Sequence, residues 1–113
     1  MLDFVYLTGY NTYYDYNKGN RYFKNWMRTL KDRVARSLIN AWIRRPSFGN
    51  KGDSKYIGDG VSELRVDYGP GYRVYYVKAN QEIIVLLCGG DKSSQSLDIE
   101  KAKQIALNLE VVE

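Results

Sequence analysis

The chain contains no histidine and only one cysteine, Cys88. A zinc site built from histidine and cysteine ligands is therefore excluded, and no internal disulfide can form. Without histidine, any phosphate chemistry has to use arginine, lysine, tyrosine and carboxylates. Cys88 lies within an apolar run, which indicates a small buried residue in a reducing compartment.

Long hydrophobic segments are also missing. The longest apolar run, residues 83–88, is far too short to span a bilayer. The N-terminus shows no basic region followed by an apolar stretch, so we expect no signal peptide. These two absences predict a cytoplasmic protein without a membrane partner.

Positive charge is concentrated in the middle of the chain. Residues 18–92 carry fifteen Lys and Arg against seven Asp and Glu, while the segments on either side each sum to −2. A basic middle with acidic ends indicates a polyanionic or acidic partner. A solvated surface that happens to be basic explains the charge equally well. The length of 113 residues corresponds to one domain.

The first half of the chain predicts a short strand followed by two helices. Residues 2–6 alternate as a strand does, and the Tyr- and Asn-rich residues 8–19 form either a loop or a hairpin extension. Apolar residues then recur at helical spacing after Asn20, a candidate N-cap. Asp32 is a candidate cap for a second helix that ends before Pro46. Two helices joined by so short a break predict an antiparallel helical hairpin.

The second half predicts three strands and a closing helix. Strand alternation begins near Lys55, and two alternating segments meet at the turn sequence Gly69–Pro70–Gly71. Residues 83–88 are apolar on both faces, as in a central strand, and Gly89–Gly90 is expected to end it. A helix follows from about residue 96. The fold class is therefore α+β, with an antiparallel meander whose second face is at least partly open.

Two motif-rich segments carry a resemblance to a known family. The sequence GDGVSELRVDYGPGYRVYY, followed by LLCGGDKSSQ, resembles the phage-derived addiction-module killer proteins of the RelE/ParE toxin superfamily. The similarity covers about residues 22–109. It implies one RelE-like domain over residues 1–113, with a Tyr-rich insertion at about residues 8–19.

The resemblance also implies a function and partners. Such proteins are toxins of type II toxin–antitoxin systems, held inactive by a cognate antitoxin through which the complex can bind operator DNA. RelE-like members cleave messenger RNA on the ribosome, without a cofactor, whereas ParE-like members poison DNA gyrase. We expect the first activity, with gyrase inhibition or a non-catalytic binding module as alternatives.

The residues that match the RelE-like motifs are basic. Arg73 matches the arginine of the GYR motif, Lys92 the basic residue after the last strand, and Arg65 a basic residue on the preceding strand. The chain departs from the pattern at Glu63, where a second basic residue is usual, and at about Asp98, where such enzymes have a tyrosine. These departures leave the exact chemistry open.

We expect Arg73 and Lys92 to contact the scissile phosphate, with Arg65 nearby, because guanidinium and ammonium groups stabilise the charge that develops during cleavage. Candidates for the general base are Glu63, Asp91 or a tyrosine whose pKa is lowered by the basic cluster.

Two further residues are candidates for RNA binding. Tyr75 should share the face of Arg73, where it could stack on a base, and Lys55 could contact the RNA backbone from the sheet edge.

Each of these assignments has a structural alternative. Arg65 could pair with Glu63 or Asp67, Arg73 could contact the antitoxin, and Lys92 could cap a turn with Asp91 as its neutralising partner.

Overall fold

The computed structural model describes residues 6–7, 13–14, 21–45, 54–78 and 83–108. Along the chain, two short strands precede two helices, four strands and a last helix, which confirms the α+β class. The elements are β1 (Tyr6–Leu7), β2 (Tyr13–Tyr14), α1 (Arg21–Thr29), α2 (Arg33–Arg44), β3 (Ser54–Gly58), β4 (Val61–Val66), β5 (Tyr72–Lys78), β6 (Ile83–Asp91), the 3-10 helix η1 (Lys92–Ser94) and α3 (Gln95–Leu107).

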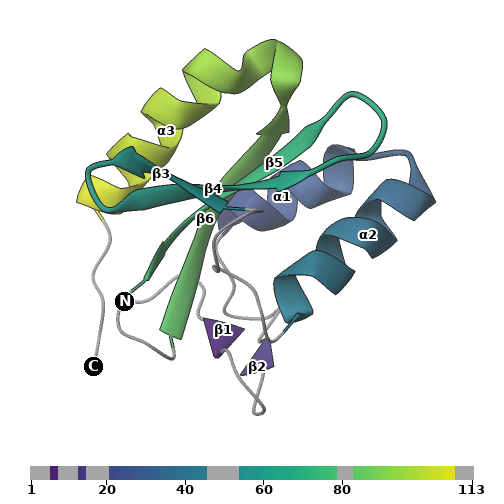
Figure 1. Ribbon diagram of the computed structural model, residues 1–113, viewed down its shortest axis with the longest axis horizontal. Coiled ribbons are helices and arrows are strands. Elements are labelled where there is room, and N and C mark those ends of the chain that lie inside the picture. Colours follow the sequence, from purple (N-terminus) through teal and green to yellow (C-terminus); the bar gives the residue numbers. More distant parts are fainter. Residues whose placement is uncertain (1–5, 8–12, 15–20, 46–53, 79–82, 109–113) are drawn as a thin grey trace.

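The described strands form one sheet in the order β2-β1-β6-β5-β4-β3, and every neighbouring pair is antiparallel (Figure 1). Strands β3 to β6 form a meander, and β1 lies against β6 on its free side. Tyr13–Tyr14, the described part of the Tyr-rich segment, pairs antiparallel with Tyr6–Leu7, an arrangement that agrees with the hairpin alternative. Residues 2–5 of the predicted first strand and most of residues 8–19 lie outside the described residues, while residue 6 belongs to β1.

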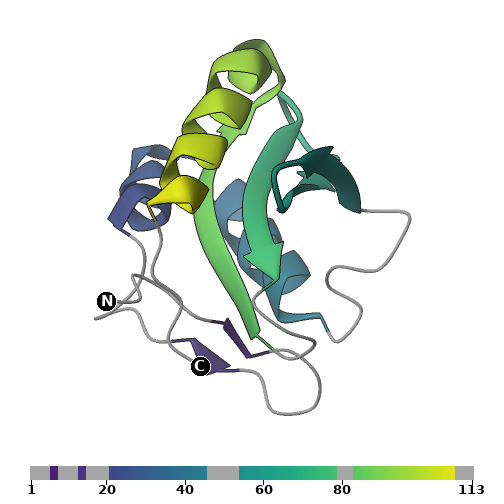
Figure 2. The ribbon, with the colours of Figure 1, turned by 90° about the vertical axis from the view of Figure 1, so that its left-hand side faces the viewer.

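Helices cover the sheet on both faces, with α1 and α2 on one side and α3 on the other (Figures 1 and 2). The hydrophobic core is correspondingly split into two clusters. Ile84 and Leu86 of β6 belong to the cluster under α1 and α2, and Val85, Leu87 and Cys88 to the cluster under α3. Strand β6 is therefore buried on both faces, as predicted. The second face of the sheet, predicted to be at least partly open, is covered where α3 packs on it, while Arg65 on β4 is exposed.

Helix α2 begins where the sequence predicts. The side chain of Asp32 accepts hydrogen bonds from the backbone N–H groups of Val34, at 2.9 Å, and Ala35, at 3.3 Å. These bonds satisfy donors that the first helical turn leaves free. The predicted cap at Asn20 and the stop at Pro46 lie outside the described residues. Among those described, no helix has the length and apolar character needed to cross a membrane.

The sequence placed the end of the last strand wrongly. Strand β6 continues through Gly89 and Gly90 to Asp91 and pairs with β5 along this stretch. A Cβ atom on Gly89 would lie 2.3 Å from the ring of Trp26, and one on Gly90 would lie 1.8 Å from Oδ2 of Asp98. Both glycines therefore lie within the strand. Glycine is needed at these positions because α1 and α3 approach the strand closely there from opposite faces.

The meander also contains one strand more than predicted. The alternation that begins near Lys55 divides into β3 and β4 at a tight turn. Gly58, Asp59 and Gly60 in this turn all have positive φ angles, of 100°, 54° and 80°. Residues that tolerate left-handed backbone allow the chain to reverse there, so β3 folds back on β4 as an additional edge strand.

Candidate functional site

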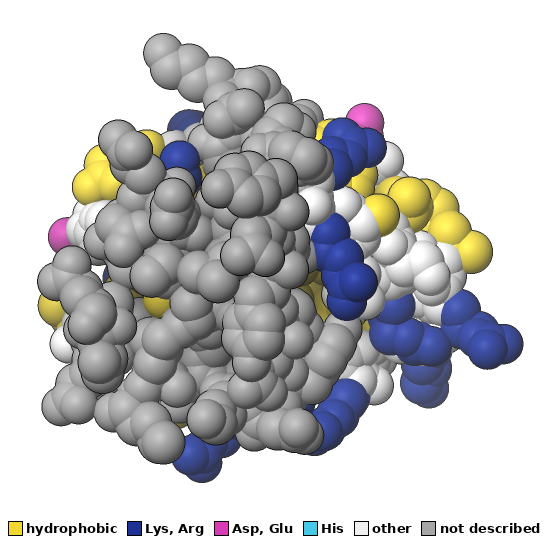
Figure 3. Space-filling view, turned by 90° about the horizontal axis from the view of Figure 1, so that it is seen from below, with side chains coloured by type: hydrophobic (Ala, Val, Ile, Leu, Met, Phe, Trp, Pro, Cys, Tyr) yellow, Lys and Arg dark blue, Asp and Glu magenta, His cyan; other side chains and the backbone are white. Residues whose placement is uncertain are grey.

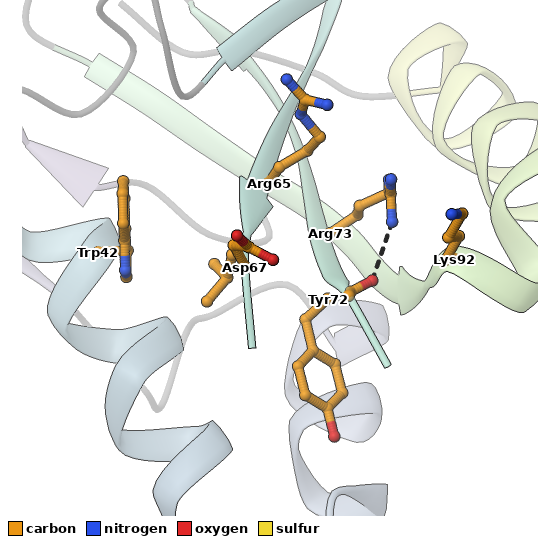
Figure 4. Close-up of a pocket in the computed structure, with 8 residues that line it drawn as sticks. Trp42, Arg65, Asp67, Tyr72, Arg73 and Lys92 are labelled. Carbon is orange, nitrogen blue, oxygen red and sulfur yellow. Dashed lines mark hydrogen bonds between the residues drawn. The ribbon is translucent and has the colours of Figure 1, made fainter. Parts of the chain in front are cut away.

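A cleft of about 440 Å³ lies where β4 ends, β5 begins and β6 leads into η1. It contains all three basic residues that the sequence analysis placed at a phosphate (Figure 4). The residues that line it are Trp42, Arg65, Val66, Asp67, Gly71, Tyr72, Arg73 and Lys92.

The sheet register brings the basic residues together. Arg65 on β4 is directly opposite Arg73 on β5, and Lys92 is the first residue after β6. Gly71 lies between them, because a Cβ atom there would be 3.4 Å from Nη1 of Arg73 and 3.7 Å from Cβ of Lys92. Its φ of 83° also disfavours any side chain. Gly71 therefore keeps the centre of the cleft open.

Two of the three positive charges in the cleft have no partner in the described part of the chain. Arg65 and Lys92 are exposed, and neither side chain makes a hydrogen bond or ion pair with another residue that the structure describes. Asp67 is the only carboxylate among the lining residues. Like charges directly opposite each other destabilise a sheet, so an anion between Arg65 and Arg73 would remove an unfavourable interaction.

Lys and Arg side chains also gather on the face of the molecule that is seen from below (Figure 3). On the face seen in Figure 3, the coloured part of the surface shows several groups of Lys and Arg and few carboxylates. Such a surface attracts polyanions over distances longer than a direct contact.

Arg73 is held in place more firmly than the other two cations. Its Nη1 donates a hydrogen bond of 2.9 Å to the carbonyl oxygen of Gly71 (Figure 4). Its Nε lies 3.6 Å from Oε2 of Glu63, and only 11% of the Arg73 side chain is exposed. The buried Nε of Arg73 has no hydrogen-bond partner among the described residues. The negative charge of Glu63 is therefore the main compensation for the positive charge of this guanidinium.

Glu63 lies behind the cleft and does not line it. The residue is 2% exposed. Its Oε2 accepts hydrogen bonds from the Tyr75 hydroxyl, at 3.1 Å, and from Nε2 of Gln95, at 2.9 Å. With two hydrogen bonds and one ion pair at the same buried oxygen, Glu63 is placed to hold Arg73 and to link β4 to α3. It does not point at a substrate.

The structure corrects the expectation for Tyr75. This residue shares the face of Arg73, as predicted, but its side chain is fully buried beneath α3, so it has no free ring face on which a base could stack. Burial, and after it the Glu63 carboxylate, raises the pKa of Tyr75. A tyrosine with a lowered pKa was one of three candidates for the general base, and the raised pKa of Tyr75 does not fit that candidate.

The other two candidates also lie outside the residues that line the cleft. The Asp91 carboxylate accepts hydrogen bonds from the hydroxyl and the backbone N–H of Ser93, and these bonds lower the pKa of Asp91. It therefore caps η1 and forms no ion pair with Lys92 in the described part of the chain. Lys55 is exposed on the edge strand β3, opposite Glu63.

Asp67 and Trp42 line the cleft but were not selected as site residues from the sequence. Asp67 follows Arg65 at a spacing of two and was named only as an alternative ion-pair partner of that arginine. Trp42 packs against the core cluster under α1 and α2 and also lines the cleft. The sequence does not distinguish an aromatic residue that also lines a cleft from one that only packs in the core.

Comparisons with known proteins find a family match for the region that contains this cleft. A family model described as "Phage derived protein Gp49-like (DUF891)" matches residues 21–109. An uncharacterized protein of Haemophilus influenzae is 51% identical over 87 residues, which span 77% of this chain and 88% of that protein. No solved structure matches the chain. The family match runs from α1 to the end of α3 and includes every residue that lines the cleft.

Proposed function

Because this chain belongs to the phage-derived Gp49-like protein family, we propose that it is a toxin of a type II toxin–antitoxin pair. Its activity is cleavage of messenger RNA on the ribosome, and a cognate antitoxin holds it inactive. The observation that supports this function is the convergence of Arg65, Arg73 and Lys92 on one cleft with a single carboxylate. RNA phosphates supply the negative charge that such a cleft lacks.

The cleavage uses the nucleophile that RNA itself carries. Asp67 accepts the proton of the 2′-hydroxyl, and the 2′-oxygen forms a bond to phosphorus. The bond from phosphorus to the 5′-oxygen then breaks, and the Lys92 ammonium donates a proton to that oxygen. The products are a 2′,3′-cyclic phosphate and a 5′-hydroxyl end.

Arg65 and Arg73 stabilise the additional negative charge on the phosphoryl oxygens during this step. Arginine suits the role because its planar guanidinium can bind two phosphate oxygens at once. Arg73 is already fixed by Gly71 and Glu63 before the substrate arrives. A donor fixed in advance needs no reorganisation in the transition state, which is where electrostatic catalysis gains most.

The test is primer extension on a defined message in a purified translation system, with and without ribosomes. We compare the wild-type protein with Arg73→Ala and Asp67→Asn, and use Arg33→Ala as the matched control. Arg33 is an exposed arginine at the start of α2 and does not line the cleft. Thermal unfolding of all four proteins is measured first. Where the profiles differ, the cleavage rates are corrected for the fraction of folded protein.

New message ends should occur with the wild-type protein and Arg33→Ala only when ribosomes are present. Arg73→Ala should slow cleavage roughly 100- to 1000-fold, the range for loss of one transition-state donor. Intact message in every lane beside an active control nuclease would reject RNA cleavage. Gyrase inhibition or a binding role would then have to account for any toxicity.

A further inference from the structure

The cleft contains an aromatic side chain as well as its three cations. Trp42 comes from α2, whereas Arg65, Arg73 and Lys92 come from β4, β5 and η1 (Figure 4). A phosphate needs only the cations. We propose that Trp42 is the stacking platform for a nucleobase, so that the cleft binds a whole nucleotide and not a phosphate alone. This inference rests on the proposed function, because it names the part of the RNA that the same site recognises.

The surroundings of Trp42 hold its ring in a fixed position. The residue packs against the core cluster under α1 and α2. The guanidinium carbon of Arg45 lies 3.7 Å from the centroid of the Trp42 ring, and Arg45 does not line the cleft. In Figure 4 the indole is seen edge-on with one face toward Asp67. Arg45 therefore contacts the ring without lining the cleft, and the ring itself lines the cavity.

A ring held in this way is suited to stacking. Stacking on an aromatic side chain is favourable for every base, because each has a π face, and a neighbouring arginine adds a cation–π contribution. A side chain already fixed by packing loses little further conformational freedom when the base arrives.

The size of the cleft agrees with this ligand. Its volume of about 440 Å³ lies within the range of roughly 300–1,000 Å³ that is usual for small-molecule sites. A single phosphate would leave most of that space empty. A nucleotide bound with its phosphate at Arg65 and Arg73 and its base toward Trp42 would use both parts of the cleft.

The experiment measures binding separately from cleavage. The probe is a fluorescein-labelled 2′-O-methyl tetranucleotide, which cannot be cleaved because its nucleophile is blocked. The comparison ligand is the same sugar–phosphate chain without bases. Fluorescence anisotropy gives the affinities of the wild-type protein, Trp42→Leu, Trp42→Phe and Arg65→Ala. Tyr56→Leu is the control, since Tyr56 is an aromatic side chain that is 66% exposed and does not line the cleft.

Trp42→Leu should weaken binding of the tetranucleotide roughly five- to a hundredfold, the effect expected for loss of one stacked base. It should leave the affinity for the chain without bases unchanged, and Trp42→Phe should be intermediate. Arg65→Ala should weaken both ligands, and Tyr56→Leu neither. If Trp42→Leu fails to fold, a several-fold loss for Trp42→Phe supports the platform and an unchanged affinity overturns it.

Two negative outcomes separate this inference from the function on which it rests. Equal binding with and without bases, still sensitive to Arg65→Ala, would overturn the platform alone and leave a phosphate site. If the wild-type protein binds neither ligand, the platform is overturned, and the ribosome-containing primer-extension reactions alone decide the proposed function.

Discussion

The ion pair behind the cleft allows a quantitative prediction. Replacement of Glu63 by glutamine keeps the size and shape of the side chain but removes its charge. Oε1 of the new amide can still accept the hydrogen bond that the Tyr75 hydroxyl now donates to the carboxylate. What is lost is the interaction with the buried guanidinium of Arg73, whose Nε has no other partner in the described part of the structure.

The expected loss follows from the geometry. Two unit charges 3.6 Å apart attract each other by about 5 kcal/mol at an effective dielectric constant near 20. Part of this energy offsets the cost of removing both charges from water, and breaking a buried pair typically costs about 3–5 kcal/mol. Because the Tyr75 hydrogen bond survives, we expect Glu63→Gln to lower the free energy of unfolding by about 3 kcal/mol. For a domain of this size, the melting temperature should fall by roughly 10 °C or more.

Urea and thermal denaturation of the full chain measure the effect. Glu100→Gln is the matched control, since Glu100 is an exposed glutamate on α3 and its replacement should change stability by less than about 0.5 kcal/mol. An Arg73→Met variant and the double variant complete a cycle that isolates the interaction energy. A free energy of unfolding for Glu63→Gln that equals that of the control would refute the idea that this pair holds Arg73.

Two further predictions concern Gly89 and Cys88. Gly89→Ala should destabilise the protein by about 1–3 kcal/mol in urea denaturation, because its Cβ atom would lie 2.3 Å from the Trp26 ring; unchanged stability would contradict the close approach of α1. Burial raises the pKa of Cys88 to about 12 from its ordinary value of 9.0, so iodoacetamide at pH 8 should modify it only after denaturant is added. The thiol ionises at a lower pH in the unfolded than in the folded protein. The contribution of neutral, buried Cys88 to stability is therefore complete below about pH 9 and is lost progressively toward pH 12. Cys88→Ala should remove that part of the alkaline decline, and an equal decline in both proteins would contradict the assignment.

Local chemistry explains why much of the fold was predictable from the sequence. The start of α2 depends on Asp32 and the N–H groups within three residues of it, so capping rules suffice. The burial of β6 on both faces follows from an apolar run with no polar alternation. The grouping of Arg65 with Arg73 follows from strand alternation and a short turn, which together set the register of β4 and β5.

The errors and omissions concern contacts between distant segments. Gly89 looked like the end of a strand because the local rule for glycine does not include the Trp26 ring that packs above it. Tyr75 looked accessible because alternation gives the face of a residue but not whether α3 covers that face. For the same reason, Glu63 could not be distinguished from a carboxylate at the surface of the site.

The opposed arginines of β4 and β5 have a consequence for how this protein tolerates change. Arg65 has no described partner, yet it is held directly across from Arg73, so the unliganded fold contains a repulsion that a neutral residue at position 65 would relieve. Selection for heat resistance alone would therefore favour loss of an arginine to which we assign phosphate binding. Conversely, any polyanion that occupies the cleft stabilises the folded state in proportion to its occupancy. Such a protein is most resistant to unfolding when a polyanion covers these charges.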